Sequence, residues 1–251
     1  MRHVAADVLT EPARTGHSAA TKDIHLLAGV PAAIRDRVLA RANVERFQAR
    51  ELLFSEGDIP EKLYVVLSGI VDLSRLHGQR ECNVMMMLAG DLFMAAATLY
   101  REPSLISART LTPCKILVLD AENVRDEARR SPALARNISQ VLAGQWRVAL
   151  RIILELKGRL PSERLAAFLL RLHDSRPAGT VAEIPFSKRQ LAARIGMQPE
   201  TLSRALQTLA ANGLLLRGRQ IIVNDRAKAE AFCGPDPYPP GNEGQLGVHT
   251  L

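Results

Sequence analysis

The middle of the chain is a series of short apolar runs separated by glycine-containing turns. Four such runs lie at residues 63–67, 70–73, 84–88 and 116–119. The segment His77-Gly78-Gln79 between two of them is typical of a hairpin tip. Short strands at this spacing indicate an antiparallel sandwich or roll. We therefore predict a β-roll domain over residues 23–130, preceded by a disordered arm over residues 1–22.

After Asp120 the apolar spacing changes to that of a helix. Alternating steps of four and three residues connect Ile138, Leu142, Gln145, Ala149, Ile152 and Leu156. This spacing is typical of a coiled-coil seam, although a helix that packs on its own domain shows it as well. Because the helix is roughly 25 residues long, has no internal proline and joins two domains, we favour a dimerisation helix over residues 131–158.

The next segment predicts two helices joined by a tight turn, after a short helix that starts near Ser162. Ser187 and Gln190 have the spacing of a capping box, Gly196 supplies the turn, and Pro199 opens the second helix. In that helix the residues spaced for burial are Leu202, Leu206 and Leu209, and those on the opposite face are Glu200, Ser203, Arg204 and Gln207.

A hairpin follows the second helix, which ends at Asn212-Gly213. Apolar residues 214–216 and 221–223 flank a turn that carries Arg217, Gly218 and Arg219. Two helices, a glycine turn and a hairpin in this order are typical of a winged helix-turn-helix, which we predict over residues 159–232. A tail rich in Pro and Gly over residues 233–251 is expected to be disordered. The fold class is α+β.

The outward face of the second helix carries groups that recognise base edges. Arg204 can donate two hydrogen bonds to guanine, Glu200 can accept one from cytosine, and Ser203 lies beside them. We expect these three residues to make base contacts. Contacts to the DNA backbone are expected from Ser187, Lys188, Arg189, Thr201, Arg217 and Arg219.

The charge of the chain supports a polyanionic partner for this part of the molecule. The net charge is +7, and residues 147–229 hold 15 Lys or Arg against 6 Asp or Glu, whereas the remainder holds 18 against 20. A basic domain beside a slightly acidic one is typical of nucleic-acid binding. A merely solubilising surface is the alternative that charge alone leaves open.

Several classes of protein are disfavoured by composition. The three cysteines, Cys82, Cys114 and Cys233, have neither a disulfide framework nor zinc-ligand spacing. A metal-dependent enzyme on a β-roll needs a histidine cluster, yet His77 is the only histidine between Phe47 and Asp120. No apolar run reaches the ~18 residues of a membrane span. We expect a cytoplasmic protein that has no membrane partner, binds no metal and is not an enzyme.

These motifs together resemble the CRP/FNR transcription regulators over about residues 25–230. Residues 52–58, 63–69 and 90–93 are similar to the family's cyclic-nucleotide-binding-type β-roll, a jelly roll with a sensor role. Glu200, Ser203 and Arg204 match the E-x-x-S-R signature of the FNR, FixK and DNR branches. The resemblance implies a homodimer on double-stranded DNA that reads a TTGAT-N4-ATCAA palindrome and contacts RNA polymerase.

Departures from the family pattern bear on the effector. Cyclic AMP binders carry Gly-Glu and Arg-Ser where this chain has Met94-Ala95 and Ser104-Leu105, so cyclic AMP binding is not expected. Residues 1–81 contain no cysteine, which excludes the FNR iron–sulfur cluster. The carbon monoxide sensors bind haem through a Cys and a His where Met94 and Ala96 stand, so that haem site is absent too.

An apolar effector pocket lined by Met85, Met87 and Met94 is one interpretation of the methionines, and ordinary core packing is the other. Similarity to the DNR branch implies a response to nitric oxide, other nitrogen oxides or low oxygen, with haem as a candidate cofactor and His25 or His77 as its ligand. A FixK-like regulator without an effector is the alternative, as is thiol control through Cys82 or Cys114, although we expect both thiols to be buried and inert.

Overall fold

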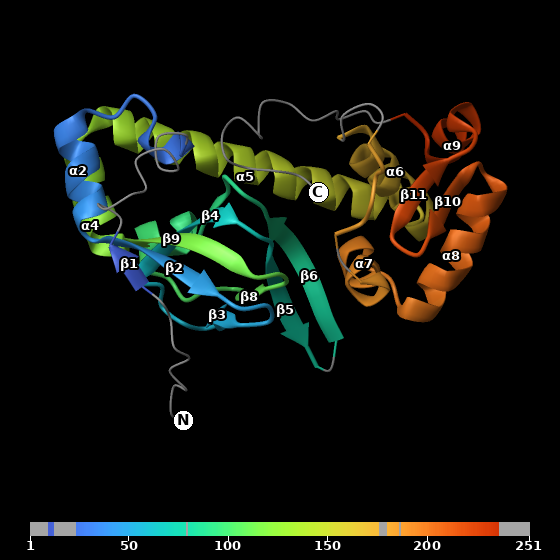
Figure 1. Ribbon diagram of the computed structural model, residues 1–251, viewed down its shortest axis with the longest axis horizontal. Helices are drawn as coiled ribbons and strands as arrows, with labels where there is room; N and C mark the ends of the chain where they lie inside the picture. Colours follow the sequence, from blue (N-terminus) through green and yellow to red (C-terminus); the bar gives the residue numbers. More distant parts are fainter. Residues whose placement is uncertain (1–9, 13–23, 79, 176–179, 186, 236–251) are drawn as a thin grey trace. The chain divides into compact units, whose positions relative to one another are not determined.

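The computed structural model describes residues 10–12, 24–78, 80–175, 180–185 and 187–235 (Figure 1). The described chain divides into two compact units, one holding residues 10–12, 24–75 and 84–148 and the other holding residues 76–83 and 149–235. The division falls inside the long helix α5 (Pro132–Gly158). Residues 131–158, which the sequence predicts as a separate dimerisation helix, are therefore shared between the two units.

The first unit contains two antiparallel sheets, which confirms the predicted β-roll. One sheet has the strand order β1-β2-β9-β4-β7 and the other has the order β3-β8-β5-β6. The strands of these sheets are β1 (Thr10–Pro12), β2 (Ala42–Phe47), β3 (Leu52–Phe54), β4 (Lys62–Ser68), β5 (Val71–His77), β6 (Arg80–Met87), β7 (Leu92–Phe93), β8 (Ser107–Thr110) and β9 (Cys114–Asp120). The end of β5 and the start of β6 fall in residues 76–83, which group with the second unit. The helices of the first unit before α5 are η1 (His25–Leu27), α2 (Ala32–Ala40), α3 (Ala95–Tyr100) and α4 (Ala121–Arg130).

The centre of the roll is the pairing of β4 with β9. Val65 lies opposite Leu117 and Val66 lies opposite Ile116, and all four side chains are fully buried. A strand that is buried on both faces has a continuous apolar sequence instead of an alternating one. This burial explains why both strands stand out as uninterrupted apolar runs.

Three parts of the first unit differ from the expectations or add to them. Residues 10–12, within the expected disordered arm, form β1 and pair with β2. The rest of that arm lies outside the described residues, as does Gln79 of the expected hairpin tip. Helix α3 follows β7 directly and has only six residues, too few to show a helical period.

The second unit confirms a helix-turn-helix followed by a hairpin. Its elements after α5 are α6 (Pro161–Asp174), α7 (Lys188–Ile195), α8 (Pro199–Ala211), β10 (Leu214–Arg217), β11 (Gln220–Val223) and α9 (Arg226–Cys233). The buried face of α6 includes Leu165, Phe168, Leu169 and Leu172. The α9 helix was not expected from the sequence. It occupies part of the predicted domain, and of the expected disordered tail only Cys233, Gly234 and Pro235 are described.

An ion pair fixes α9 against α6. Two guanidinium nitrogens of Arg226 each donate to an oxygen of Asp174 at 2.8 Å. The hydrogen bond from Arg226 holds the pKa of the Asp174 carboxyl below its ordinary value, in spite of partial burial. A two-pronged pair of this kind has a defined geometry and joins the end of α6 to the start of α9.

Gly69, in the turn between β4 and β5, is a position that only glycine satisfies. Its φ is +92°, and a Cβ atom there would lie 2.5 Å from the Pro113 carbonyl oxygen and 2.6 Å from the Cys114 sulfur. We predict that Gly69→Ala lowers the free energy of unfolding by roughly 1–3 kcal/mol for the backbone alone, with the clash adding to that loss.

Gly57→Ala is the matched control for this prediction. Gly57 has a similar φ of +89°, but a Cβ atom added there would have nothing within 4 Å. Urea unfolding followed by circular dichroism should therefore show a smaller loss for Gly57→Ala than for Gly69→Ala. Equal losses at the two positions would show that backbone strain, and not close contact, explains the glycine at 69.

Candidate nucleic-acid interface and β-roll cavity

The turn between α7 and α8 is built from local sequence signals. The Ser187 hydroxyl accepts from the Gln190 amide at 3.3 Å, and the Gln190 side chain accepts from the Ser187 amide at 2.8 Å, which confirms the capping box. Gly196 ends α7 in the left-handed region at φ +72°, and Pro199 opens α8. The start of one helix and the end of the other are thus both fixed by residues next to the turn.

Arg164 of α6 reinforces this turn from inside the unit. Its guanidinium is buried and donates to the Ile195 carbonyl at 3.1 and 3.3 Å and to the Arg159 carbonyl at 2.8 Å. Burial lowers the pKa of Arg164 below its ordinary value, and the nearby Glu155 carboxylate offsets only part of this effect. The last carbonyl of α7 thereby gains a charged donor. The sequence hints at this contact in one way, because Arg164 stands directly beside the apolar residues that α6 buries.

Helix α8 separates an inner apolar face from an outer polar one. The buried residues are Leu202, Ala205 and Leu209, and the predicted Leu206 is only half-buried because the small Ala205 takes the inner position. The exposed residues are Glu200, Ser203, Arg204 and Gln207, as expected. The Ser203 hydroxyl donates to the Pro199 carbonyl at 3.3 Å, so it already has one partner in the helix.

The residues expected to contact the DNA backbone fall into two groups. Lys188, Arg189, Thr201 and Arg217 are exposed around the turn and the hairpin. Ser187 and Arg219 are exposed too, but each has a partner within the chain. Ser187 caps α7, and the Arg219 Nε donates to the Ile184 carbonyl at 2.8 Å. These two residues therefore hold the fold of the unit whether or not they meet a phosphate.

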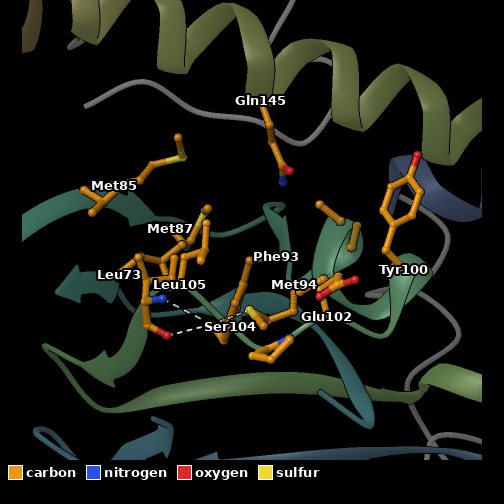
Figure 2. Close-up of a pocket in the computed structure, with 16 residues that line it drawn as sticks. Leu73, Met85, Met87, Phe93, Met94, Tyr100, Glu102, Ser104, Leu105 and Gln145 are labelled. Carbon is orange, nitrogen blue, oxygen red and sulfur yellow. Dashed lines mark hydrogen bonds between the residues drawn. The ribbon is translucent and has the colours of Figure 1, made fainter. Parts of the chain in front are cut away.

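A cavity of about 650 Å³ lies in the first unit, beside β6, β7 and α3. Met85, Met87 and Met94 all line it, which places the three methionines of the predicted effector pocket around one space. Figure 2 shows them together with Phe93, Leu73 and Leu105, and with Gln145 reaching toward them from α5. Its volume is within the range of small-molecule sites.

The cavity lining is mostly apolar. Among the described lining residues Glu102 is the only charged one, and none is a histidine or cysteine. The Ser104 hydroxyl is buried and donates to the Ile106 carbonyl at 2.6 Å. Met94 has a φ of +70°, a conformation that costs a residue with a side chain roughly 1–2 kcal/mol.

Two residues of the predicted coiled-coil seam, Ile138 and Gln145, pack mainly within the single chain. Ile138 is only 4% exposed in the single chain, so most of its surface packs within its own unit. Gln145 faces the roll, where its amide donates to the Leu92 carbonyl at 2.6 Å. Leu142, Ala149 and Ile152 are half-exposed and Leu156 is exposed. The apolar residues exposed along α5 are Trp146, Leu150, Ile153, Leu154 and Leu156.

Comparison with known proteins agrees with both halves of this geometry. Residues 44–131 match the cyclic nucleotide-binding domain and residues 163–232 match the Crp-like helix-turn-helix domain. The cyclic AMP receptor protein of Thermus thermophilus is 32% identical over 167 residues, which cover 66% of this chain and 76% of that protein. The chain belongs to the CRP/FNR superfamily of transcription regulators.

Two further members are similar to this CRP/FNR regulator. The nitrogen fixation regulation protein FixK of Rhizobium meliloti is 29% identical over 183 residues, covering 72% of this chain and 81% of that protein. The structure of FixK2 from Bradyrhizobium japonicum matches with a TM-score of 0.66 and 26% identity, over 76% of this chain and 96% of that one. Members of this superfamily are transcription regulators that bind DNA through the helix-turn-helix.

Three features of the described residues concern metal ligands, membrane spans and histidines. No cluster of three or more His, Cys, Asp or Glu in the described residues has the geometry of a metal site. No helix among them has both the length and the apolar character needed to cross a membrane. His25 lies in η1, outside the cavity lining, and the side chain of His77 lies outside the described part.

The expectation that Cys82 and Cys114 are both buried is half right. Cys114 is buried, and burial raises the pKa of its thiol; the same holds for Cys233. Cys82 is exposed, because it lies near the start of β6 at the end of the β5–β6 hairpin. Thiol control is therefore more consistent with Cys82 than with Cys114.

We predict that the native protein has a single fast-reacting thiol. Iodoacetamide labelling followed by mass spectrometry should modify Cys82 first, since the raised pKa and burial of Cys114 and Cys233 leave little accessible thiolate at neutral pH. Denaturation should expose all three, and Cys82→Ser should remove the fast phase. Fast labelling of Cys114 in the native protein would contradict the prediction.

Proposed function

We propose that this regulator acts as a homodimer that reads an FNR-type palindrome, TTGAT-N4-ATCAA. The observation that carries the proposal is the exposed row of Glu200, Ser203 and Arg204 at the start of α8, on a turn fixed by the capping box and by Arg164. A guanidinium there can donate two hydrogen bonds to guanine, and a carboxylate can accept from cytosine. Similarity to FixK proteins supports the FNR type of site.

Dimerisation is proposed through α5. Its exposed apolar residues include Trp146, Leu150 and Ile153, at steps of four and three residues, and such a stripe on a long helix is typical of a helix pair. A palindrome read by two equal subunits requires a fixed separation of the two recognition helices, about one turn of DNA. A signal that changes the packing of α5 would change that separation, which is a two-state mechanism. Contact with RNA polymerase belongs to the same proposal.

We predict that Arg204→Ala weakens binding by about 1–3 kcal/mol per half-site and relaxes the preference for its base pair. Fluorescence anisotropy with the palindrome and with duplexes altered at single positions measures both effects. Arg136→Ala is the charge-matched control, because Arg136 is an exposed arginine of α5 in the other unit. The control should leave both affinity and base preference unchanged.

Two results of the binding measurements would contradict base recognition by Arg204. An equal loss on every duplex, with base preference retained, would show that Arg204 contacts phosphate and that another residue reads the base. A loss of similar size in Arg136→Ala would show that net charge alone governs the affinity. Measuring at two salt concentrations separates the two cases, since a phosphate contact changes the salt dependence.

The signal in this proposal is a nitrogen oxide or low oxygen. Relatives whose names refer to the regulation of nitrogen fixation or to nitrogen support a signal of this kind. Haem is a poor match to the cavity as its carrier, because the described lining offers the iron no histidine or cysteine and only methionine and tyrosine side chains. Cyclic AMP does not fit either, since Ala95 and Ser104 replace the ribose-binding carboxylate and the phosphate-binding arginine. The exposed Cys82 is the described group most open to oxidants and nitric oxide.

We predict that protein purified from cells grown at low oxygen has no Soret absorption band. Addition of haemin should likewise produce no band that shifts with nitric oxide, because the described cavity residues supply no strong axial ligand. A nitric oxide-sensitive Soret band would contradict this. His25→Ala and His77→Ala would then locate the haem ligand.

A further inference from the structure

We propose that the β-roll cavity binds an uncharged, predominantly apolar organic molecule. The cavity measures about 650 Å³ and is lined by aliphatic, methionine and aromatic side chains from β5, β6, β7 and α3. Sites of this size and character bury most of the surface of a small organic ligand. Binding of such a molecule is a property of the first unit and does not depend on the proposed reading of DNA.

The charges around the cavity exclude an anion. Glu102 is the only charged side chain among the described lining residues, and it is a carboxylate near the exposed edge. A phosphate or carboxylate group in this cavity would have no cationic partner among the described lining residues and would lie near a group of like charge. Because an unpaired buried charge is strongly unfavourable, a neutral molecule is the occupant that the lining accepts.

The buried polar groups of the cavity already have partners in the protein. The Ser104 hydroxyl donates to the Ile106 carbonyl and also accepts from the Ile106 amide at 3.3 Å. The Gln145 amide donates to the Leu92 carbonyl. A ligand with many polar groups would have to break these bonds, whereas an apolar ligand leaves them intact. The lining therefore favours few hydrogen-bonding groups on the occupant.

Met94 gives independent support. Its φ of +70° is the left-handed conformation that glycine adopts freely and that a methionine adopts under strain. A glycine would hold this backbone conformation without strain, so the methionine is not needed for the turn itself. What the methionine adds is a thioether that is almost fully buried and lines the cavity (Figure 2). Strain that places an apolar group in a cavity wall is expected where that wall has a binding role.

The edge of the cavity is apolar as well. Leu105 and Tyr100 line it and are 77% and 78% exposed, and Val84 is also exposed. Single exposed apolar residues are ordinary, but three that line the same cavity make much of its edge apolar. An apolar molecule could pass this edge without meeting a charged group other than Glu102.

Two fluorescent probes with closely related aromatic frames test the proposal on the full-length protein. N-phenylnaphthylamine is neutral, and anilinonaphthalene sulfonate carries one negative charge. We expect the neutral probe to bind with saturable fluorescence at one site per chain and the anionic probe to bind roughly tenfold more weakly or not at all. An excess of cyclic AMP should not displace the neutral probe.

Leu105→Glu and Leu52→Glu are the matched variants. Both replace an exposed leucine of the first unit, but only Leu105 lines the cavity. Leu105→Glu should weaken the neutral probe roughly tenfold, because it adds a second carboxylate to the edge, and Leu52→Glu should leave it unchanged. Ala97→Phe, which adds a ring at the lining, should reduce binding without adding charge. Circular dichroism confirms that each variant is folded.

Several outcomes would overturn the proposal. One is equal binding of the two probes, since that would indicate adsorption to general apolar surface. Another is an equal effect of Leu105→Glu and Leu52→Glu, which would place the probe outside the cavity. Displacement of the probe by cyclic AMP, or absence of any saturable binding, would do so too. None of these results bears on DNA recognition, so failure here is distinct from failure of the proposed function.

Discussion

The polar side chains of α5 are the interactions on which the rest of the structure depends. Within the first unit, Asn137 donates to the Leu26 and Ala28 carbonyls and Gln145 donates to the Leu92 carbonyl. Within the second unit, Glu155 accepts two bonds from Arg171. Bonds to buried or partly buried groups are costly to leave unmade, so each favours one rotation of the helix against its unit. One unbroken helix thus carries side chains committed to the cavity-bearing unit and others committed to the DNA-reading unit.

The DNA-reading elements could be predicted from sequence because their rules are local. Ser187 with Gln190, Gly196 and Pro199 act over three or four residues, and the structure places all of them as expected. The support from Arg164 could not be predicted in the same way, because its acceptor, the Ile195 carbonyl, lies 31 residues away in sequence. Leu206 shows the same limit on a smaller scale, since the depth of burial within a helix face depends on the neighbouring elements.

The long helix shows why spacing alone does not separate residues that pack within the chain from residues that could meet a second copy. A spacing of alternating three and four residues marks an apolar face, but it does not say whether that face meets the same chain or a second one. Ile138 and Gln145 meet the same chain, whereas Trp146 and Leu150 are exposed. The sequence was ambiguous in a similar way about whether the three methionines share one space. Met85 and Met87 lie on one face of β6 by strand alternation, yet only the folded roll brings Met94 beside them.

The link between the cavity and α5 sets the size of any response. Gln145 lines the cavity and holds the helix to β7 through one hydrogen bond, whose net contribution is about 0.5–1.5 kcal/mol. An occupant that only broke this bond would change a two-state equilibrium by roughly tenfold at most. A larger shift would need differential burial of apolar area, at roughly 25 cal/mol per Å², between the two states. An apolar occupant that contacts both the roll and Gln145 could supply that area. A diatomic gas in the cavity has too little surface to do so, so a nitric oxide signal would act through a reactive group such as Cys82 and not as a cavity occupant.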